Sequence, residues 1–249
     1  MLTSTRHARI LSVLSADGEA TVEALADTLR VSPSTIRRDL NALDAAGLMR
    51  RVRGGASIER DPVSITQTAV QQRAEKQRIA SAAAAEVRDG DVVLIDIGAT
   101  CALVARELRG RKITVVTASL AVVDELREDD DLELIVLGGA VRKNYQSMVG
   151  AFALQALTQI RASVCFLGTS GVQADGSIHD STPTEVPIKQ ALLDASERRI
   201  VLADGAKFPG VSVARVAGPE RIGMLVTDDG ADPATLAELR RAGVDITIA

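Results

Sequence analysis

The stretch VSPSTIRRDLNALDAAGL, residues 31–48, predicts a short helix with two contrasting faces. Ser32 is a good N-cap, Pro33 fits the first helical position, and Gly47 fits the C-terminal end. Aliphatic side chains recur at i, i+4 and i+7 and form an apolar face: Ile36, Leu40 and Leu43. The opposite face carries hydroxyl, guanidinium and amide groups: Ser34, Arg37, Arg38 and Asn41. Such groups bind phosphates and base edges, although a solvated surface helix can carry the same pattern.

The neighbouring segments favour the DNA-binding interpretation. Residues 3–18 and 20–31 each predict a helix, and Thr21 is the expected N-cap of the second one. Two helices joined by a tight turn, the second with a polar front, make a helix-turn-helix unit. Residues 48–56 then predict a strand that breaks at Gly54-Gly55, with basic side chains beside the turn: Arg50, Arg51 and Arg53. We interpret this basic hairpin as the wing of a winged helix, placed to contact the phosphate backbone.

The charge is distributed unevenly along the chain, whose net charge is −4. Residues 1–55 contain eight arginines and six acidic residues, net +2, so the remaining residues carry −6. Residues 32–55 alone contain five arginines and two aspartates, net +3. A basic patch at one end of an acidic protein indicates a nucleic acid as partner.

Length and composition exclude several classes of protein. A chain of 249 residues suits two domains, and 46% hydrophobic residues is enough for extended cores. No apolar run reaches the roughly 18 residues of a membrane span, and ILSVL is too short for the core of a signal peptide. Cys101 and Cys165 are isolated, and we expect reduced, buried thiols in a cytoplasmic protein. We expect His7 and His179 to be solvated, and we expect no metal and no cofactor.

From residue 75 onward, helical stretches alternate with short apolar strands. The first helix is expected over 75–87, after a linker at 57–74. The expected strands lie at 92–96, 113–118, 132–138, 163–168, 199–204, 223–228 and 245–249. The expected helices between them lie at 100–110, 119–128, 151–160, 188–197 and 233–243. This alternation predicts a mostly parallel sheet covered on both faces, in an α/β domain at 75–249 that follows a winged helix-turn-helix domain at 1–56.

Parallel sheets of this kind bind ligands at the carboxyl ends of their strands. The residues that follow the expected strands are mostly small, hydroxylic or charged: Asp96, Gly98, Thr100, Thr117, Ser119, Gly138, Gly139, Asp204 and Lys207. Helix N-termini at Thr100 and Ser119 add free N–H groups that suit a phosphate. Turn chemistry explains most of the glycines, but it explains less well the successive hydroxyls and the position of Lys207. We therefore expect a small anionic ligand at this edge.

A further pair of charges lies in TEVPIKQALL, residues 184–193. Glu185 and Lys189 are spaced i, i+4, which suits an ion pair on a helix surface. Pro187 prefers the first helical turn, however, so Glu185 lies just ahead of the helix and both charges can face the ligand site. Neither G-x-x-x-x-G-K-[ST] nor G-x-G-x-x-G occurs, which argues against a nucleotide hydrolase or a dinucleotide oxidoreductase.

Over nearly its whole length the chain resembles the DeoR family of bacterial transcriptional regulators. The N-terminal motif is VSPSTIRRDLNALDAAGLMRRVRGGA. The later motifs are EKQRIASAAA, GDVVLIDIGATCALVARELRG, TVVTASL, IVLGGAVRKNYQSMVG, FLGTSGV, TEVPIK and LADGAKF. The resemblance implies a cytoplasmic repressor whose C-terminal domain is similar in fold to ribose-5-phosphate isomerase and binds a phosphorylated sugar or related metabolite. We also expect a homo-oligomer that binds a double-stranded DNA operator.

The resemblance also implies a role for each group of residues. DNA reading falls to Ser34, Thr35, Arg37 and Arg38, and the polar helix face and the basic wing add Asn41, Arg51 and Arg53. Effector binding falls to Asp96, Gly98, Thr100, Thr117, Ser119, Gly138, Gly139, Glu185, Lys189, Asp204 and Lys207.

Two other functions stay open at this point. The chain could be a sugar-phosphate isomerase-type enzyme fused to a DNA-binding module, with Glu185 as the base that removes a proton beside a carbonyl. Alternatively, the C-terminal domain could serve only for oligomerisation, with a vestigial pocket. An enzyme does not need a DNA-binding module, so we expect a regulator rather than an enzyme.

Overall fold

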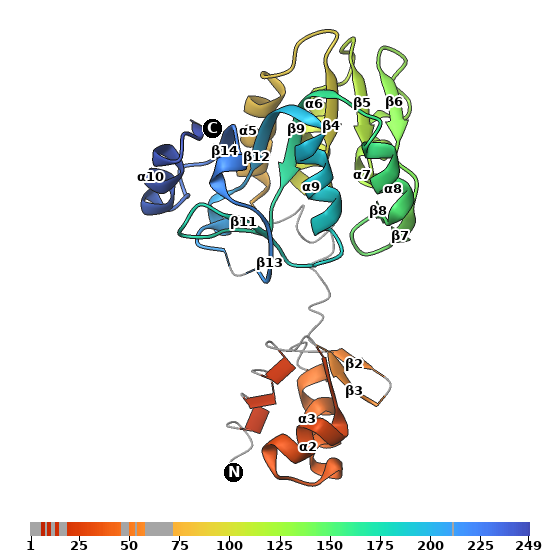
Figure 1. The fold of residues 1–249 in the computed structure, drawn as a ribbon, viewed down its shortest axis with the longest axis vertical. Coiled ribbons are helices and arrows are strands. Elements are labelled where there is room, and N and C mark those ends of the chain that lie inside the picture. The colour runs from red at the N-terminus through yellow and green to blue at the C-terminus, as the bar shows by residue number, and fades with distance from the viewer. Residues whose placement is uncertain are drawn as a thin grey trace. The chain divides into compact units, whose positions relative to one another are not determined.

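A computed structural model describes residues 6–7, 9–10, 13–14, 19–45, 50–52, 54–57, 72–210 and 212–249. The chain divides by its internal contacts into two units, Met1–Ser64 and Ile65–Ala249. Each unit has its own buried core, and Figure 1 shows the helices and strands of each. We describe the two units separately below.

The N-terminal unit is a helix-turn-helix with a small antiparallel sheet. Its elements are β1 (Glu19–Thr21), α2 (Val22–Leu29), α3 (Pro33–Ala45), β2 (Arg50–Val52) and β3 (Gly55–Ser57). Residues 6–7, 9–10 and 13–14 are also helical. The Thr21 hydroxyl caps α2 by accepting a hydrogen bond from the N–H of Ala24, and the Ser32 hydroxyl accepts one from the N–H of Thr35. Both helix starts are therefore as predicted.

The wing turn requires both of its glycines, for different reasons. Gly54 has a φ of +87°, in the left-handed region that favours glycine. A Cβ on Gly55 would lie 2.3 Å from the carbonyl oxygen of Ala20, because β1 pairs with β3. The sheet order is β1-β3-β2. The sequence did not predict β1, since three residues are too few to show a strand period.

All seven strands expected in the C-terminal unit are present, and they form one parallel sheet. They are β4 (Val92–Ile95), β5 (Thr114–Thr117), β6 (Glu133–Val136), β9 (Ala162–Gly168), β12 (Ser196–Leu202), β14 (Met224–Thr227) and β15 (Asp245–Ile248). Their order is β15-β14-β12-β9-β4-β5-β6, with every neighbouring pair parallel. The chain runs outward from β4 to β6 and then returns to β9, on the other side of β4. Such a reversal marks the crevice where open α/β sheets bind ligands.

Helices cover both faces of this sheet, as the apolar strands predict. One face packs against α5 (Arg73–Ala84), α6 (Ala99–Glu107) and α7 (Leu120–Leu126). The other packs against α8 (Ala151–Leu157), α9 (Val186–Asp194) and α10 (Pro233–Arg241) (Figure 1). Successive residues of β4 alternate between the two cores, with Val93 and Ile95 on one face and Leu94 on the other. In the described part of the chain, no helix is long and apolar enough to cross a membrane.

The segment between the units differs at both ends from the expected linker at 57–74. Ser57 is the last residue of β3, and α5 begins at Arg73 rather than at residue 75. Residues 58–71, which include Pro62, lie outside the described residues.

Several short elements were not predicted. They are the hairpin of β7 (Ala140–Arg142) and β8 (Ser147–Val149), the antiparallel strands β10 (Gly171–Val172), β11 (Ile178–Asp180) and β13 (Ala214–Ala217), and two 3-10 turns at Gly205–Lys207 and Pro219–Arg221. None exceeds four residues, so none shows a recognisable period in the sequence. Most of them follow the carboxyl ends of β6, β9 and β12, and they surround the edge at which a ligand is expected.

Both cysteines are free and buried, as expected. Burial raises the pKa of the Cys165 thiol to about 11, and it also raises the pKa of Cys101 well above its usual range. Both thiols are therefore protonated at neutral pH and act as small apolar core residues.

Candidate functional site

The polar face of α3 lies on the surface of the N-terminal unit. Four of the predicted DNA-binding residues of α3 are exposed, namely Ser34, Arg37, Arg38 and Asn41. The fifth, Thr35, is half-buried. Arg37 forms an ion pair with Glu23 of α2 at 3.8 Å, and both side chains are more than half exposed. Exposed pairs of this kind contribute little free energy. The Arg37 guanidinium can therefore exchange this partner for a phosphate or a base edge.

A hydrogen bond between two predicted DNA-binding residues joins the wing to α3. The Arg51 guanidinium donates to the side-chain oxygen of Asn41 at 2.7 Å. The Asn41 amide keeps its two N–H donors for another partner. Arg53, the other predicted wing residue, lies outside the described residues.

The buried side of α3 is fixed by Asp39, whose side chain is only 6% exposed. The Arg6 guanidinium donates to both Asp39 carboxylate oxygens, at 2.5 and 2.8 Å, and the His7 ring lies 3.1 Å from one of them. Hydrogen bonds from Arg6 and then from His7 hold the pKa of Asp39 below its usual value. His7 is thus half-buried and partnered, and the prediction of a solvated histidine is wrong. His179 is likewise half-buried and hydrogen-bonded to Ser177.

The point at which the strand order reverses holds a cluster of buried charges. The Lys189 ammonium, from α9, forms an ion pair with Asp96 at the end of β4 and lies 3.4 Å from Asp180. It also donates to the carbonyl of Gly168 at 2.8 Å, and the N–H of Gly168 donates to Asp96 at 3.0 Å. Lys189 and Asp96 are 2% and 1% exposed. These contacts tie the ends of β4 and β9 together across the expected ligand crevice.

Lys189 stays charged although it is buried. Burial opposes the charged ammonium, but the carboxylates of Asp96 and Asp180 outweigh burial and raise the pKa of Lys189 above its usual value. One ammonium faces two carboxylates, so the cluster as a whole carries a charge of −1 when both are ionised.

Glu185 belongs to a second cluster. It precedes α9 with Pro187 in the first turn, as predicted. Its carboxylate is 1% exposed and accepts hydrogen bonds from Ser147 at 2.7 Å and from Arg142 at 2.5 Å. The Arg142 guanidinium also stacks on the ring of Tyr145, 4.0 Å from its centre. Glu185 and Lys189 are therefore not a surface ion pair: both are buried, and each has partners from other elements.

The 3-10 turn after β12 carries Asp204 at its start and Lys207 at its end. Asp204 caps the turn by accepting a hydrogen bond from the N–H of Ala206, and its other oxygen pairs with Lys76 of α5 at 3.0 Å. This pair is buried, with side chains 2% and 3% exposed. Lys207 is half-buried and forms no ion pair with another described residue.

The remaining predicted effector residues mostly serve the local backbone. The Thr117 hydroxyl donates to the carbonyl of Ile95 and accepts from the N–H of Ser119, while the Ser119 hydroxyl caps α7. A Cβ on Gly139 would lie 2.5 Å from the carbonyl oxygen of Val149, so this glycine allows the hairpin to approach; Gly138 has open space instead. Gly98 precedes α6 with a φ of +117° and provides no side-chain cap. Thr100, in the first turn of α6, is 9% exposed.

Four residues of these clusters were missed by the sequence reasoning: Lys76, Arg142, Ser147 and Asp180. Arg142 and Ser147 lie in the motif IVLGGAVRKNYQSMVG, so that motif was the one signal that pointed to them. Asp180 and Lys76 come from a three-residue strand and from a helix whose start was placed too late. The partner of Lys76 is Asp204, more than a hundred residues away in the sequence, and no local pattern around either residue indicates the pair.

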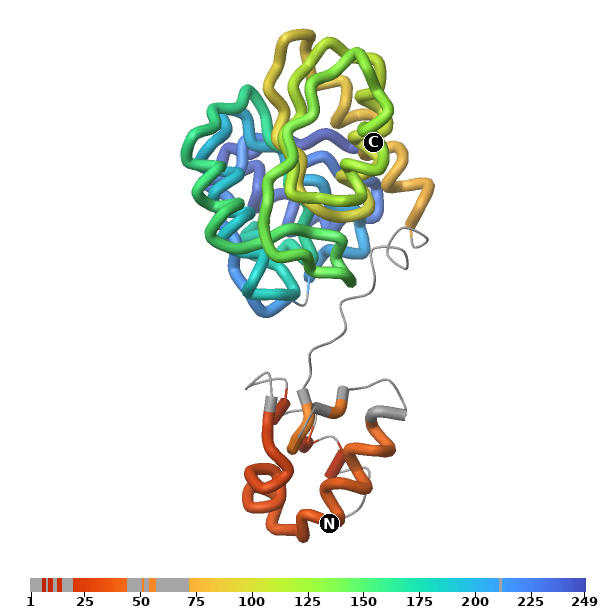
Figure 2. The backbone as a smooth tube through the Cα atoms, turned by 90° about the vertical axis from the view of Figure 1, so that its right-hand side faces the viewer, coloured from red at the N-terminus to blue at the C-terminus, as the bar shows by residue number. Residues whose placement is uncertain are grey.

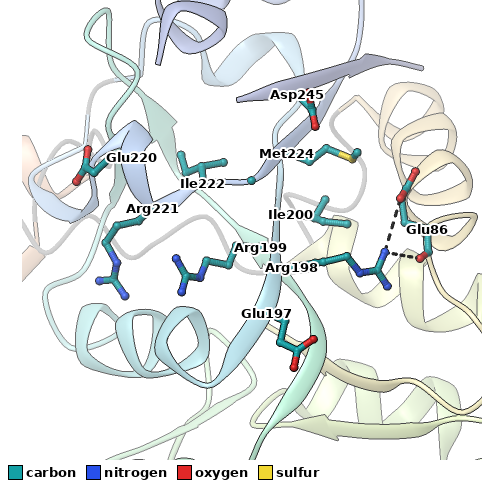
Figure 3. Close-up of a pocket in the computed structure, with 11 residues that line it drawn as sticks. Glu86, Glu197, Arg198, Arg199, Ile200, Glu220, Arg221, Ile222, Met224 and Asp245 are labelled. Atoms are coloured by element: carbon teal, nitrogen blue, oxygen red, sulfur yellow. Dashed lines mark hydrogen bonds and ion pairs between the residues drawn. The ribbon is translucent and has the colours of Figure 1, made fainter. Parts of the chain in front are cut away.

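A separate cavity of about 320 Å³ lies at the amino ends of β12, β14 and β15, away from the carboxyl ends where the ligand is expected (Figure 3). Its walls carry arginines and acidic side chains, and Arg198 points toward Glu86, to which it is joined. No predicted effector residue lines this cavity. Within the described residues, no group of three or more His, Cys, Asp or Glu side chains is arranged to hold a metal ion.

Comparisons with known proteins cover nearly the whole chain. A family model described as the DeoR C terminal sensor domain matches residues 71–229, and one described as the DeoR-like helix-turn-helix domain matches residues 6–61. The transcriptional repressor AccR of Agrobacterium fabrum is 34% identical over 239 residues, which cover 92% of this chain and 90% of the relative. The glycerol-3-phosphate regulon repressor of Escherichia coli is 31% identical over 231 residues, which cover 92% of each chain.

Among solved structures, a ribose 5-phosphate isomerase A from Methanocaldococcus jannaschii matches 53% of this chain and 52% of its own, with a TM-score of 0.39 and 18% identity. The family models and the nearly full-length relatives decide between the regulator and the enzyme that the sequence left open. The chain belongs to the DeoR family of transcriptional regulators and not to a family of enzymes.

Proposed function

We propose that the protein is a repressor that binds operator DNA through α3 and the wing. Its affinity for the operator changes when a phosphorylated sugar or related metabolite binds at the carboxyl ends of the parallel strands. The observation that carries the effector site is a pair of positive groups that follow the two strands on either side of β9. These are the half-buried Lys207 and the N-terminus of α6, which has no side-chain cap.

The spacing of these groups suits a small phosphate ester. Lys207 follows β12 and Gly98 follows β4, and β9 lies between these two strands. Neighbouring strands are about 4.8 Å apart, so the two strand ends are separated by roughly 10 Å. The phosphate of a sugar phosphate can bind at one of these groups, either Lys207 or the free N–H groups of α6. The sugar then extends far enough to reach the other group. The Thr100 hydroxyl supplies a further donor at the helix start.

The names of the relatives support the same class of effector and the same direction of control. One relative is a glycerol-3-phosphate regulon repressor and another is named a transcriptional repressor. A helix-turn-helix regulator acts where the DNA is, so we place the protein in the cytoplasm. We also propose that it works as a homo-oligomer, because two copies can read two operator half-sites.

The buried ion pair between Lys76 and Asp204 is our proposed route from the effector to the DNA-binding unit. Lys76 lies in the first turn of α5, the first described helix after the segment that joins the units. Asp204 caps the turn that carries Lys207. An anion bound at Lys207 adds negative charge close to Asp204, so it changes the balance of the ion pair that holds α5. A tenfold to hundredfold change in operator affinity needs only about 1.4–2.8 kcal/mol.

The test combines ligand binding with operator binding. Glycerol 3-phosphate and the common pentose and hexose phosphates are screened by thermal shift, with inorganic phosphate as reference. A true effector at 100 times its dissociation constant adds about 2.7 kcal/mol to the free energy of unfolding. The best ligand is then added to titrations of the protein's own promoter DNA. The variant Lys207→Ala is expected to bind this DNA as the parent does, but to lose the response to the ligand.

The matched control is Lys112→Ala, which removes an exposed lysine just ahead of β5, at the amino ends of the strands. This variant should respond as the parent does. If Lys207→Ala also keeps the full response, Lys207 does not hold the effector. If no phosphate ester stabilises the parent, the proposed class of effector is wrong.

A further inference from the structure

The sheet of the C-terminal unit ends at β6, where several large apolar side chains are exposed. They are Ile135 and Val136 of β6, Val141 of β7 and Phe152 of α8, with exposed fractions of 40%, 44%, 53% and 78%. We call these four residues the β6 patch. Figures 1 and 2 show β6, the β7–β8 hairpin and α8 on the same flank of the unit. Strands of parallel sheets are normally buried on both faces, so this edge is unusual.

The helices cover β6 less completely than they cover β5. Val116 of β5 is 1% exposed, whereas Ile135, its partner in β6, is 40% exposed. Thr117 and Val136 form the next pair of the register, at 0% and 44%. The two pairs face opposite sides of the sheet, so β6 exposes an apolar side chain on each face, although Leu134 of the same strand still packs against the core on the side of α7. In the described residues β6 pairs with β5 alone, which leaves its outer N–H and C=O groups without a strand partner.

The opposite edge of the sheet is different. The edge strand there is β15, which has an exposed Asp245 at its start and one large exposed apolar side chain, Ile248. β6 also begins with an exposed acidic residue, Glu133, but it carries two large exposed apolar side chains, Ile135 and Val136, where β15 carries one.

We propose that the β6 patch is the surface on which a second copy of this chain binds, with the two β6 strands antiparallel across a two-fold axis. A two-fold axis brings the same patch of both copies together, and it necessarily runs their edge strands in opposite directions. The second copy thus supplies both an apolar surface and a strand for the open edge of β6.

The charges along this edge suit the antiparallel arrangement. Exposed acidic residues, Asp130 and Asp131, precede β6, and Glu133 begins it. At the other end, the exposed Lys143 follows β7. Within the described part of the chain, Asp130, Asp131 and Lys143 form no ion pair. Antiparallel pairing places the acidic end of one copy beside the basic end of the other, whereas a different partner would have to supply this charge pattern by chance.

The same surface adjoins the candidate effector site through β7. Val141 and Arg142 are neighbours in this strand, so their side chains point to opposite faces. Val141 is exposed in the patch, and Arg142 binds Glu185 in the buried cluster. A second copy that packs on Val141 therefore contacts the same strand that positions Arg142. This link to effector binding, like the association of copies in general, rests on the proposed function, whereas the choice of the β6 patch as the contact does not.

Sedimentation velocity on the full-length chain over micromolar concentrations tests the association directly. The parent is expected to sediment as a dimer or a larger even assembly. Ile135→Asp and Phe152→Asp are each expected to weaken association at least tenfold, because they place a carboxylate inside the contact. The matched control is Val213→Asp, since Val213 is 73% exposed ahead of β13 and outside the patch; it should sediment as the parent does. Circular dichroism checks that every variant is folded.

A charge exchange separates a direct contact from a general loss of structure. Lys143→Glu should weaken association, and adding Asp131→Lys to the same chain should restore it, because each copy then offers the opposite charge at each end. A parent that is monomeric throughout the range overturns the proposal. So do patch variants that associate as the parent does, a Val213→Asp variant that dissociates as readily as they do, or a charge exchange that restores nothing.

Discussion

The two units of this protein use charged side chains in opposite ways. Arg37 of α3 is 56% exposed and has one weak ion pair, whereas Lys189 of α9 is 2% exposed and is surrounded by two carboxylates and a carbonyl. The exposed cation can bind an external anion, while the buried one is already neutralised by carboxylates of the fold. Exposure, rather than residue type, decides which charges are available for binding.

The difference follows from the partners. DNA is a long polyanion, and a protein binds it by placing flexible cations on an open surface, where they displace condensed counterions. A small metabolite has few atoms, so its site must be rigid and its polar groups must be fixed in advance. The buried ion pairs of the C-terminal unit stiffen the edge of the sheet at which we propose the effector site, and in that proposal Lys207 is the cation that meets the ligand.

The largest expected effect tests the buried side of this comparison. Lys189→Met removes the ammonium and leaves the buried carboxylates of Asp96 and Asp180 without their cation. Breaking a buried pair in this way costs about 3–5 kcal/mol of unfolding free energy. Urea denaturation followed by circular dichroism measures the loss.

The control for this loss is Arg127→Met, in an ion pair with Asp124 whose side chains are both more than 60% exposed. It should change the unfolding free energy by less than about 0.5 kcal/mol. Equal effects of the two substitutions would contradict the distinction between buried and exposed charges. The double variant Lys189→Met with Asp96→Leu should recover part of the stability, since an apolar pair needs no counter-charge.

A smaller effect, in binding rather than in folding, is expected on the exposed side. Arg37→Ala should weaken binding to the protein's own promoter by about 1–3 kcal/mol and relax the base preference, because a guanidinium can contact guanine through two hydrogen bonds. Its unfolding free energy should hardly change. Fluorescence anisotropy at several salt concentrations measures both affinity and salt dependence.

Arg9→Ala is the control for this measurement, because Arg9 is an exposed arginine of the same unit outside α3 and the wing. It should bind the promoter nearly as the parent does. A folded Arg37→Ala/Arg38→Ala double variant that binds as tightly as the parent would show that α3 is not the recognition helix.

The smallest expected effect concerns Asp39, a buried charge within the DNA-binding unit. Its pKa is held below the usual value in the folded state by Arg6 and His7. The carboxylate therefore contributes its full stability above the ordinary pKa of an aspartate, about 3.9, and this contribution is lost as the pH falls through the lower, folded pKa. Thermal unfolding of the parent and of Asp39→Asn is compared between neutral pH and pH about 3. The variant should melt a few degrees lower at neutral pH, and the difference should shrink once the pH falls below the ordinary aspartate pKa of about 3.9. A difference that persists unchanged in acid would show that the charge of Asp39 does not stabilise the unit.

Most of the fold could be predicted because its signals are local. Each of the seven parallel strands is visible in the sequence as an apolar run, and each helix as a helical period. Both signals lie within about ten residues. The N-caps Thr21 and Ser32 and the glycines of the wing are similarly local. The short strands β7, β8, β10, β11 and β13 were missed, since two to four residues cannot establish a period.

The places of the buried charged residues along the elements were predicted, but their connections were not. Asp96 and Asp204 follow β4 and β12, and Glu185 precedes the helix that carries Lys189, as expected. Their partners were not expected. Glu185 binds Arg142 and Ser147 instead of Lys189, and Asp204 binds Lys76.

The sequence by itself determined the two domains, the polar face of α3, the parallel strands and the edge at which charged residues gather. Only the tertiary structure decided which charges meet. Helical periods, strand periods and caps depend on residues a few positions apart, so they can be recognised in the sequence alone. Lys189 and Asp96 are 93 positions apart, and they meet because the chain crosses from β6 back to β9 and places α9 beside the end of β4. Ion pairs of this kind depend on the order of the strands, which no local pattern records.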